Sequence, residues 1–166
     1  MKLSDFRCVC DHVNLDDYLK LYKYVRDGME NPNWLGAFTK KEIKDWLNLK
    51  GKIWLYYSGE DLVCSMFLLP SNNKTLNKHK VFQEADLVAS LGPIMVSPLY
   101  RGNHLQLQMM EVLEDYCKNH NYQYLYTKVC SDNIYSLSNI YEFGFLETDK
   151  YENDRGNNIS FLKKIA

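Results

Sequence analysis

Apolar residues recur at two different spacings along the chain, and the change of spacing predicts where helices and strands lie. A spacing of three to four residues, which is typical of one face of a helix, runs through 15–25, 43–47, 105–116 and 134–141. Runs of apolar, aromatic and β-branched residues predict strands at 6–10, 53–57, 62–69, 86–96, 122–129, 145–151 and 158–163. The predicted order is therefore strand, two helices, three strands, helix, strand, helix and two strands.

Local signals mark several ends of these elements. Asn14 is a favoured N-cap residue, and Thr39-Lys40-Lys41-Glu42 fits a capping box, in which side chain and backbone satisfy each other. Gly144 followed by Phe145 suits a Schellman ending of the last helix. The polar, lysine-bearing segment 71–80 is predicted to be a mobile loop.

The element order predicts a mixed α/β (α+β) fold with one sheet flanked by helices. The chain has 166 residues and no internal repeat, which favours a single domain over 1–166. Gly92-Pro93 falls inside the strand predicted at 86–96, and proline cannot donate to a strand ladder. We therefore expect a bulge or a local splaying of the sheet at this pair.

The composition of the chain excludes two classes of binding partner. Twenty Lys and Arg residues stand against 21 Asp and Glu residues, giving a net charge of −1. Proteins that bind nucleic acid without reading its sequence need a surplus of positive charge, so we expect no nucleic-acid partner. The first seven residues lack the apolar run of a signal peptide, and no stretch approaches the roughly 20 apolar residues of a membrane span. We expect a cytoplasmic protein with no membrane partner.

The five cysteines lie at scattered positions in apolar segments and form no Cys-x-x-Cys pair. We expect them to be reduced and structural, with no metal site. Cys130 is also considered as a nucleophile that carries an acyl group, but no paired base is evident in the sequence.

The segment 96–106 carries the most chemical information. A strand ends, a turn containing Arg101 and Gly102 follows, and a helix begins near Leu105. The amides at a helix N-terminus and the helix dipole favour an anion, and Arg101 adds a forked, permanent positive charge. The pattern suits a pyrophosphate, although Arg-Gly-Asn is also an ordinary turn. A nucleotide-phosphate protein is a remote reading, because no Gly-Lys-Ser/Thr or Gly-x-Gly-x-x-Gly motif is present.

Two motifs in this order resemble the GCN5-related N-acetyltransferases, known as the GNAT family. The run Val-x-Pro-x-Tyr-Arg-Gly-Asn-x-Leu-Gln at 96–106 is similar to the acetyl-CoA signature of that family. The run 131–137, which leads to Glu-Phe-Gly-Phe at 142–145, is similar to its second signature. The family often has small residues where this chain has His104 and Gln106, and often has a tyrosine where this chain has Ile140. The element order also resembles the GNAT fold, with a mostly antiparallel sheet of about six or seven strands and about four helices.

The resemblance implies a binding site for acetyl-CoA. It assigns the pantetheine arm to the end of one strand, the pyrophosphate to the turn and helix start, and a further contact to the second signature. Asn133 is equally suited to capping its own helix. The implied residues are Ile94, Met95, Val96, Arg101, Gly102, Asn103, His104, Leu105, Gln106, Asn133 and Ser136. Glu30 and Trp34, in the region 28–38, are the candidates for contact with the acceptor.

The resemblance also implies direct attack of an amine on the thioester within a ternary complex. Asp86, near the start of the predicted strand, is the candidate base, with a solvated strand-end aspartate as the alternative. Tyr141 and then Tyr135 are the candidate acids for the departing thiolate, with ordinary core tyrosines as the alternative. The expected function is N-acetylation of a small-molecule or peptide amine by a monomer or homodimer. The alternative is an acyl-CoA-binding sensor or scaffold without turnover.

Overall fold

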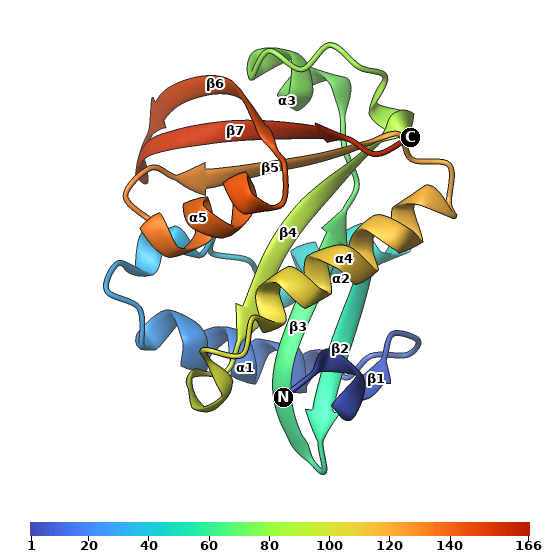
Figure 1. Cartoon of the computed structure of the whole chain (residues 1–166), viewed down its shortest axis with the longest axis vertical. Helices are drawn as coiled ribbons and strands as arrows, with labels where there is room; N and C mark the ends of the chain where they lie inside the picture. Colours follow the sequence, from blue (N-terminus) through green and yellow to red (C-terminus); the bar gives the residue numbers. More distant parts are fainter. The chain divides into compact units, whose positions relative to one another are not determined.

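Seven strands follow the order β1-β2-β3-β4-β5-β7-β6 in the computed structural model, which describes all residues 1–166. Their bounds are Arg7–Val9, Lys52–Ser58, Asp61–Leu69, Val88–Val96, Tyr124–Cys130, Leu146–Asn153 and Gly156–Lys164 for β1 to β7. Helices α1 to α5 are Leu15–Asp27, Lys40–Asn48, Asn73–Lys78, Leu105–Lys118 and Ile134–Glu142 (Figure 1). The pairings β1–β2, β2–β3, β5–β7 and β6–β7 are antiparallel, whereas β4 and β5 are parallel. The prediction of one mixed, mostly antiparallel sheet with helices is confirmed.

The chain forms two compact units. Met1–Leu69 and Gly92–Met109 make the first, called here the N-terminal unit. Pro70–Leu91 and Met110–Ala166 make the second, called the C-terminal unit. Two elements, β4 and α4, begin in one unit and end in the other. A single domain over 1–166 stays a prediction from the sequence.

The N-terminal unit buries one apolar cluster between its helices and its strands. The apolar face of α1 and Ile43 of α2 pack with inward residues of β2, β3 and β4. Both helices begin where the sequence predicts. Asn14 Oδ1 accepts from the amides of Asp16 and Asp17, and Thr39 with Glu42 forms the capping box. The buried members of the cluster are Tyr18, Leu21, Tyr22, Val25, Leu35, Ile43, Ile53, Leu55, Tyr57, Phe67 and Met95.

Gly92 marks an irregularity in β4. The register of β4 with β5 covers Val88 to Ser90 and ends before Gly92, as the Gly92-Pro93 pair led us to expect. A Cβ added at Gly92 would lie 3.0 Å from Phe67 Cβ and 3.1 Å from the Phe67 carbonyl oxygen. The close approach of β4 to β3 therefore favours glycine at this position, because a larger residue would force its neighbours to shift.

Replacing Gly92 by alanine is expected to lower the free energy of unfolding by about 1–3 kcal/mol, because the added methyl group overpacks the interface with β3. Urea denaturation followed by circular dichroism measures the change. Gly28→Ala is the matched control, since the nearest atoms to its new Cβ lie 3.6 and 3.8 Å away, which is ordinary contact. Equal stabilities for the two variants would contradict a tight contact at Gly92.

The C-terminal unit places β5, β7 and β6 side by side, with α5 against one face (Figure 1). Tyr141 of α5 packs edge-on against Phe161 of β7, with the ring centroids 5.3 Å apart. The predicted Schellman ending of α5 is confirmed, because the Phe145 amide donates to the Ile140 carbonyl and Gly144 has φ +98°. A second, smaller cluster of Leu76, Val81, Val88 and Tyr126 is buried in this unit.

Two sequence predictions need correction in this unit. The segment 71–80, predicted to be a loop, contains helix α3, capped by Asn72 through the Thr75 amide at 2.9 Å. Leu76 is its one buried residue, so the segment has no apolar periodicity that could have revealed a helix. The strand predicted from residue 86 begins at Val88, because a 3-10 turn occupies Ala85–Leu87.

None of the helices combines the length and the hydropathy that crossing a bilayer requires.

Candidate functional site

The turn between β4 and α4 has an unusual backbone. After β4 ends at Val96, the 3-10 helix Pro98–Tyr100 leads into Gly102 with φ +85° and His104 with φ +56°. Left-handed residues in a turn can bring neighbouring amides toward one side, an arrangement that suits an anion. The first backbone bond of α4 runs from the Gln108 amide to the His104 carbonyl at 3.2 Å, so the helix N-terminus directly follows this turn.

Two amide side chains fix the shape of the turn. Asn103 Nδ2 donates to the Tyr100 carbonyl at 3.0 Å, and Gln108 Nε2 donates to the Asn103 carbonyl at 3.1 Å. Gln108 Oε1 accepts from the Leu3 amide at 2.7 Å, which anchors the first residues of the chain. Asn103, predicted to contact the cofactor, thus has a structural use for its side chain.

Gln108 was missed by the sequence reasoning. It follows the motif by two residues and lies among apolar helix positions, where a partly buried amide is unusual. A polar residue among apolar helix positions was the one feature of the sequence that could have indicated a structural role for Gln108. Gln108 holds the turn in place and is a positioning residue.

The turn carries a single free cation. Arg101 is exposed and forms no ion pair, so its guanidinium remains available to an anion. A Cβ at Gly102 would meet no atom within 4 Å, which leaves open space on that side of the backbone. The predicted grouping of Arg101, Gly102, His104 and Leu105 in one turn and helix start is present.

His104 occupies a place where the resembled family often has a small residue. Its φ of +56° lies in the left-handed region, where glycine fits without strain and histidine is uncommon. The side chain is exposed. The substitution therefore keeps the backbone conformation that a glycine would adopt, at a cost in local strain.

The second predicted segment lies in the C-terminal unit and has its own geometry. Asn133 is buried and caps α5, since its Oδ1 accepts from the Ser136 amide at 3.3 Å. Its Nδ2 donates to Ser136 Oγ at 3.1 Å. Both polar atoms of Asn133 are used within the helix start, which favours the capping role. Contact of Asn133 or Ser136 with a cofactor stays a prediction.

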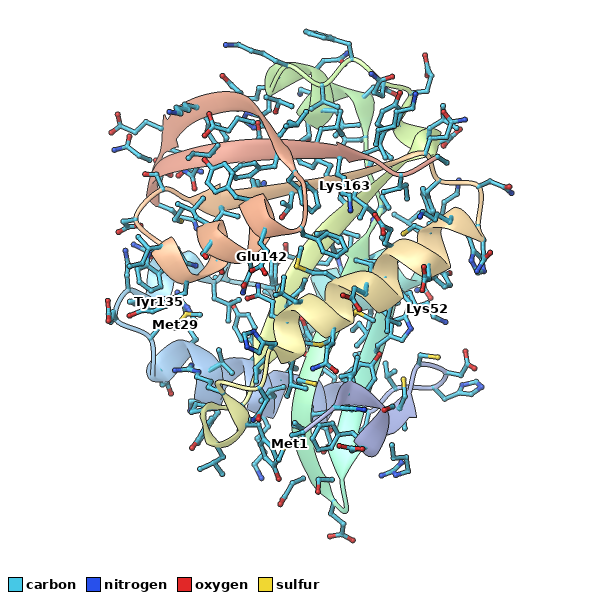
Figure 2. All side chains as sticks on the ribbon, in the orientation of Figure 1. Met1, Met29, Lys52, Tyr135, Glu142 and Lys163 are labelled. Carbon is cyan, nitrogen blue, oxygen red and sulfur yellow. The ribbon has the colours of Figure 1, made fainter.

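Both candidate acids, Tyr135 and Tyr141, are exposed residues of α5. Tyr141 donates its hydroxyl hydrogen to the Glu147 carboxylate, and this bond raises the pKa of Tyr141. Tyr135 is 64% exposed and lies near the start of the helix (Figure 2). Neither tyrosine is buried in the core, which was the alternative interpretation from the sequence.

The candidate base does not lie in β4. Asp86 is exposed in the 3-10 turn before the strand, whereas Met95 is one residue from the end of the strand. A strand advances about 3.3 Å per residue, so roughly 23 Å of strand separate Val88 from Met95. Asp86 therefore lies before the opposite end of β4 from Met95, and its role as the base stays a prediction.

The acceptor candidates lie in the N-terminal unit. Trp34 ends the 3-10 helix Pro32–Trp34, which Asn31 caps through the Asn33 amide at 3.0 Å. Arg26 Nε donates to the Pro32 carbonyl at 3.3 Å, so the segment is tied to the end of α1. Glu30 is exposed in the same loop. Their contact with an acceptor stays a prediction.

All five cysteines are free thiols. Burial raises the pKa of Cys130, and its Sγ donates to Asn158 Oδ1 at 3.4 Å. A raised pKa lowers the thiolate fraction, which disfavours Cys130 as a nucleophile. No group of His, Cys, Asp and Glu side chains has the arrangement of a metal site.

The fold and the turn define an α/β protein in which a turn with two left-handed residues leads into the N-terminus of a long helix. Residues 21–145 match the family model described as "Acetyltransferase (GNAT) family". The match spans more than half of the 166 residues, and the chain belongs to the GNAT acetyltransferase family. No curated protein matches the sequence significantly.

Solved structures show the same fold at low identity. Ard1 from Thermoplasma volcanium aligns with a TM-score of 0.71 and 13% identity, covering 96% of this chain and 98% of that one. The ribosomal-protein-S18-alanine N-acetyltransferase from Escherichia coli aligns at 0.68 and 14%, covering 96% and 95%. A GNAT family acetyltransferase from Elizabethkingia anophelis, solved with acetyl-CoA bound, aligns at 0.67 and 12%, covering 96% and 97%.

Proposed function

We propose that this protein transfers the acetyl group of acetyl-CoA to a primary amine by direct attack in a ternary complex. The observation that carries the proposal is the turn from β4 into α4. It combines two left-handed residues, an unpaired arginine and a helix N-terminus in a chain of the GNAT family. The acetyl-CoA in the Elizabethkingia anophelis structure supports the choice of acyl donor.

The residues of the N-terminal unit suit the donor. The backbone amides from Arg101 to Gln106 would hold the pyrophosphate, with Arg101 adding charge. The pantetheine arm would follow Ile94, Met95 and Val96, which lie beyond the β4–β5 ladder that ends at Ser90. Acetyl-CoA supplies a thioester carbonyl for attack and a thiolate as leaving group. Backbone amides fixed in a strand stabilise the charge that develops on that carbonyl oxygen, which is commonly the largest catalytic contribution.

Proton transfers complete the proposed reaction. The amine must attack in its neutral form, and the thiolate must gain a proton. Tyr141 is the first candidate acid, with its hydroxyl ordered by Glu147, and Tyr135 is the second. Asp86 stays the candidate base for the amine proton, which it would accept directly or through one water.

Binding of acyl-CoA without turnover is the alternative function. The observation that favours it is the absence of the predicted base from β4, since Asp86 precedes the strand. The acceptor, a small molecule or a peptide amine, the cytoplasmic location and the monomeric or homodimeric state all stay predictions from the sequence.

Isothermal titration calorimetry with CoA, followed by a thiol-release assay with acetyl-CoA and a panel of amines, tests the proposal. We expect saturable binding and amine-dependent release of CoA. Tyr141→Phe and Tyr135→Phe are made as single variants and assayed side by side. The acid is the residue whose replacement lowers kcat without changing the affinity for CoA. Binding without amine-dependent release would support the sensor function, and absence of binding would reject both functions.

A further inference from the structure

Two thiols lie close together at the edge strand β1 of the N-terminal unit. Cys8 belongs to β1 and Cys10 is the first residue after it, so Val9 alone separates them. Alternate residues of a strand point to the same face. Val9 packs against the apolar cluster of the N-terminal unit, and Cys8 and Cys10 therefore point away from that cluster, to the opposite face of β1.

The pair is accessible from solution. Cys8 is exposed and Cys10 is half-buried. Strand β1 is the first in the strand order, so it has β2 as its one neighbour and no strand covers its outer edge (Figure 1). The other three thiols, Cys64, Cys117 and Cys130, are buried. A thiol reagent in solution therefore reaches Cys8 before any other cysteine.

The third thiol of the N-terminal unit is too distant to pair with Cys8. The strand registers place Tyr56 of β2 opposite Cys8, and Cys64 of β3 opposite Tyr56. Neighbouring strands lie about 4.8 Å apart, so about 9.6 Å separates the Cα atoms of Cys8 and Cys64. A disulfide spans roughly 7 Å at most between Cα atoms. Cys10 is therefore the one partner within reach of Cys8 in this unit.

The spacing of Cys8 and Cys10 allows a disulfide, but not a relaxed one. Two residues of extended strand advance about 6.6 Å, whereas Cα atoms joined by a disulfide usually lie roughly 4.4–6.8 Å apart. A bridge would therefore lie at the long end of this range unless β1 shortens. Exposed or strained disulfides are the ones that are most readily reduced, so a bridge at this position should open and close.

The electrostatic surroundings of Cys8 agree with a neighbouring thiol. Burial raises the pKa of Cys8 and Cys10 adds to the increase, whereas Tyr56 and Lys52 oppose it. A raised pKa lowers the fraction of thiolate, which is the form that attacks a disulfide. Oxidation of this pair should therefore be slow, and it should follow a sustained excess of oxidant.

We propose that Cys8 and Cys10 form a reversible dithiol–disulfide pair that exchanges with small disulfides of the glutathione class. Cys8 loses its proton to water and attacks one sulfur of the small disulfide, which releases one small thiolate. Cys10, also deprotonated, then attacks the Cys8 sulfur and displaces the second small thiolate. Both released thiolates take up a proton from water. Two protein thiols are thus oxidised to one disulfide, and one small disulfide is reduced to two thiols.

Oxidised glutathione is the probe for this pair, which does not depend on the proposed acetyltransferase function. After acid quenching, the remaining thiols are alkylated and the protein is analysed by mass spectrometry. We expect the wild type to lose two alkylatable thiols, with the bridge in the peptide that contains residues 8–10, and an excess of reduced glutathione to restore both. Cys64→Ala is the matched control, because it removes a thiol of the same unit and should keep the bridge.

Single serine variants test the order of the two steps. Cys10→Ser should retain glutathione on Cys8, because no second thiol can displace it. Since the second step is intramolecular in the wild type, we expect about 10-fold more bound glutathione in Cys10→Ser than in the wild type. Cys8→Ser should bind little glutathione, because Cys10 is half-buried. Equal binding by the two variants would contradict the assignment of Cys8 as the attacking thiol.

Three results with the wild type would overturn the proposal. Glutathione that stays bound to Cys8 would show that Cys10 cannot reach it. A disulfide between two chains would show that the edge strand pairs with a second copy instead. A bridge that excess reduced glutathione does not open would be a stable structural disulfide.

Discussion

Replacement of Phe67 by alanine is expected to lower the free energy of unfolding by about 3–5 kcal/mol, the range for removing a buried aromatic ring. Phe67 has no exposed surface and lies in the buried cluster of the N-terminal unit. Its ring meets Tyr18 and Trp46 edge-on, with centroid distances of 5.9 and 6.1 Å. The substitution therefore removes apolar burial and two aromatic contacts together, and leaves a cavity between α1, α2 and β3.

Urea denaturation followed by far-ultraviolet circular dichroism measures this loss. Phe82→Ala is the control, since Phe82 is 75% exposed and its truncation should change stability by less than about 0.5 kcal/mol. Similar losses in the two variants would show that the cluster around Phe67 is not packed as described.

Reversal of charge at Arg101 is expected to weaken CoA binding about 100-fold. A hydrogen bond to a charged group contributes about 1.5–3 kcal/mol, and Arg101→Glu adds repulsion between a carboxylate and the phosphates. Arg101 has no ion pair to compensate for the change, so the full effect should appear in the dissociation constant. The backbone amides of the turn remain, which explains why binding should be weakened and not abolished.

Isothermal titration calorimetry gives the dissociation constant for CoA directly. Lys23→Glu makes the same change of net charge on an exposed residue of α1 and should alter affinity less than two- to threefold. If both variants weaken binding equally, the effect would be one of overall charge, and the turn would not be the phosphate site.

The sequence predicted those features that depend on neighbouring residues. Asn14, the Thr39–Glu42 capping box and the Gly144 ending were legible because a cap is made by side chains within a few positions. Gly92-Pro93 likewise indicated the place where the β4–β5 ladder stops. Each of these signals is local, and each element appears within a few residues of its predicted position.

Features that depend on distant residues were not predictable. The bond from the Leu3 amide to Gln108 joins positions 105 residues apart, and the contact of His79 with Asp149 joins different elements across the fold. Helix α3 escaped detection because Leu76 alone anchors it. Asp86 shows a related difficulty, because a shift of two residues in the start of β4 decides whether a carboxylate belongs to the strand.

The side chain of Gln108 links two parts of the chain that are far apart in sequence. Gln108 receives the backbone of residue 3 with its oxygen and supports the backbone of residue 103 with its nitrogen. Residues 1–3 and the turn proposed to hold the phosphates are thus both anchored by Gln108. Any change that breaks the bond to Leu3 is expected to loosen this turn as well, so the affinity for CoA would report on the order of the N-terminal residues.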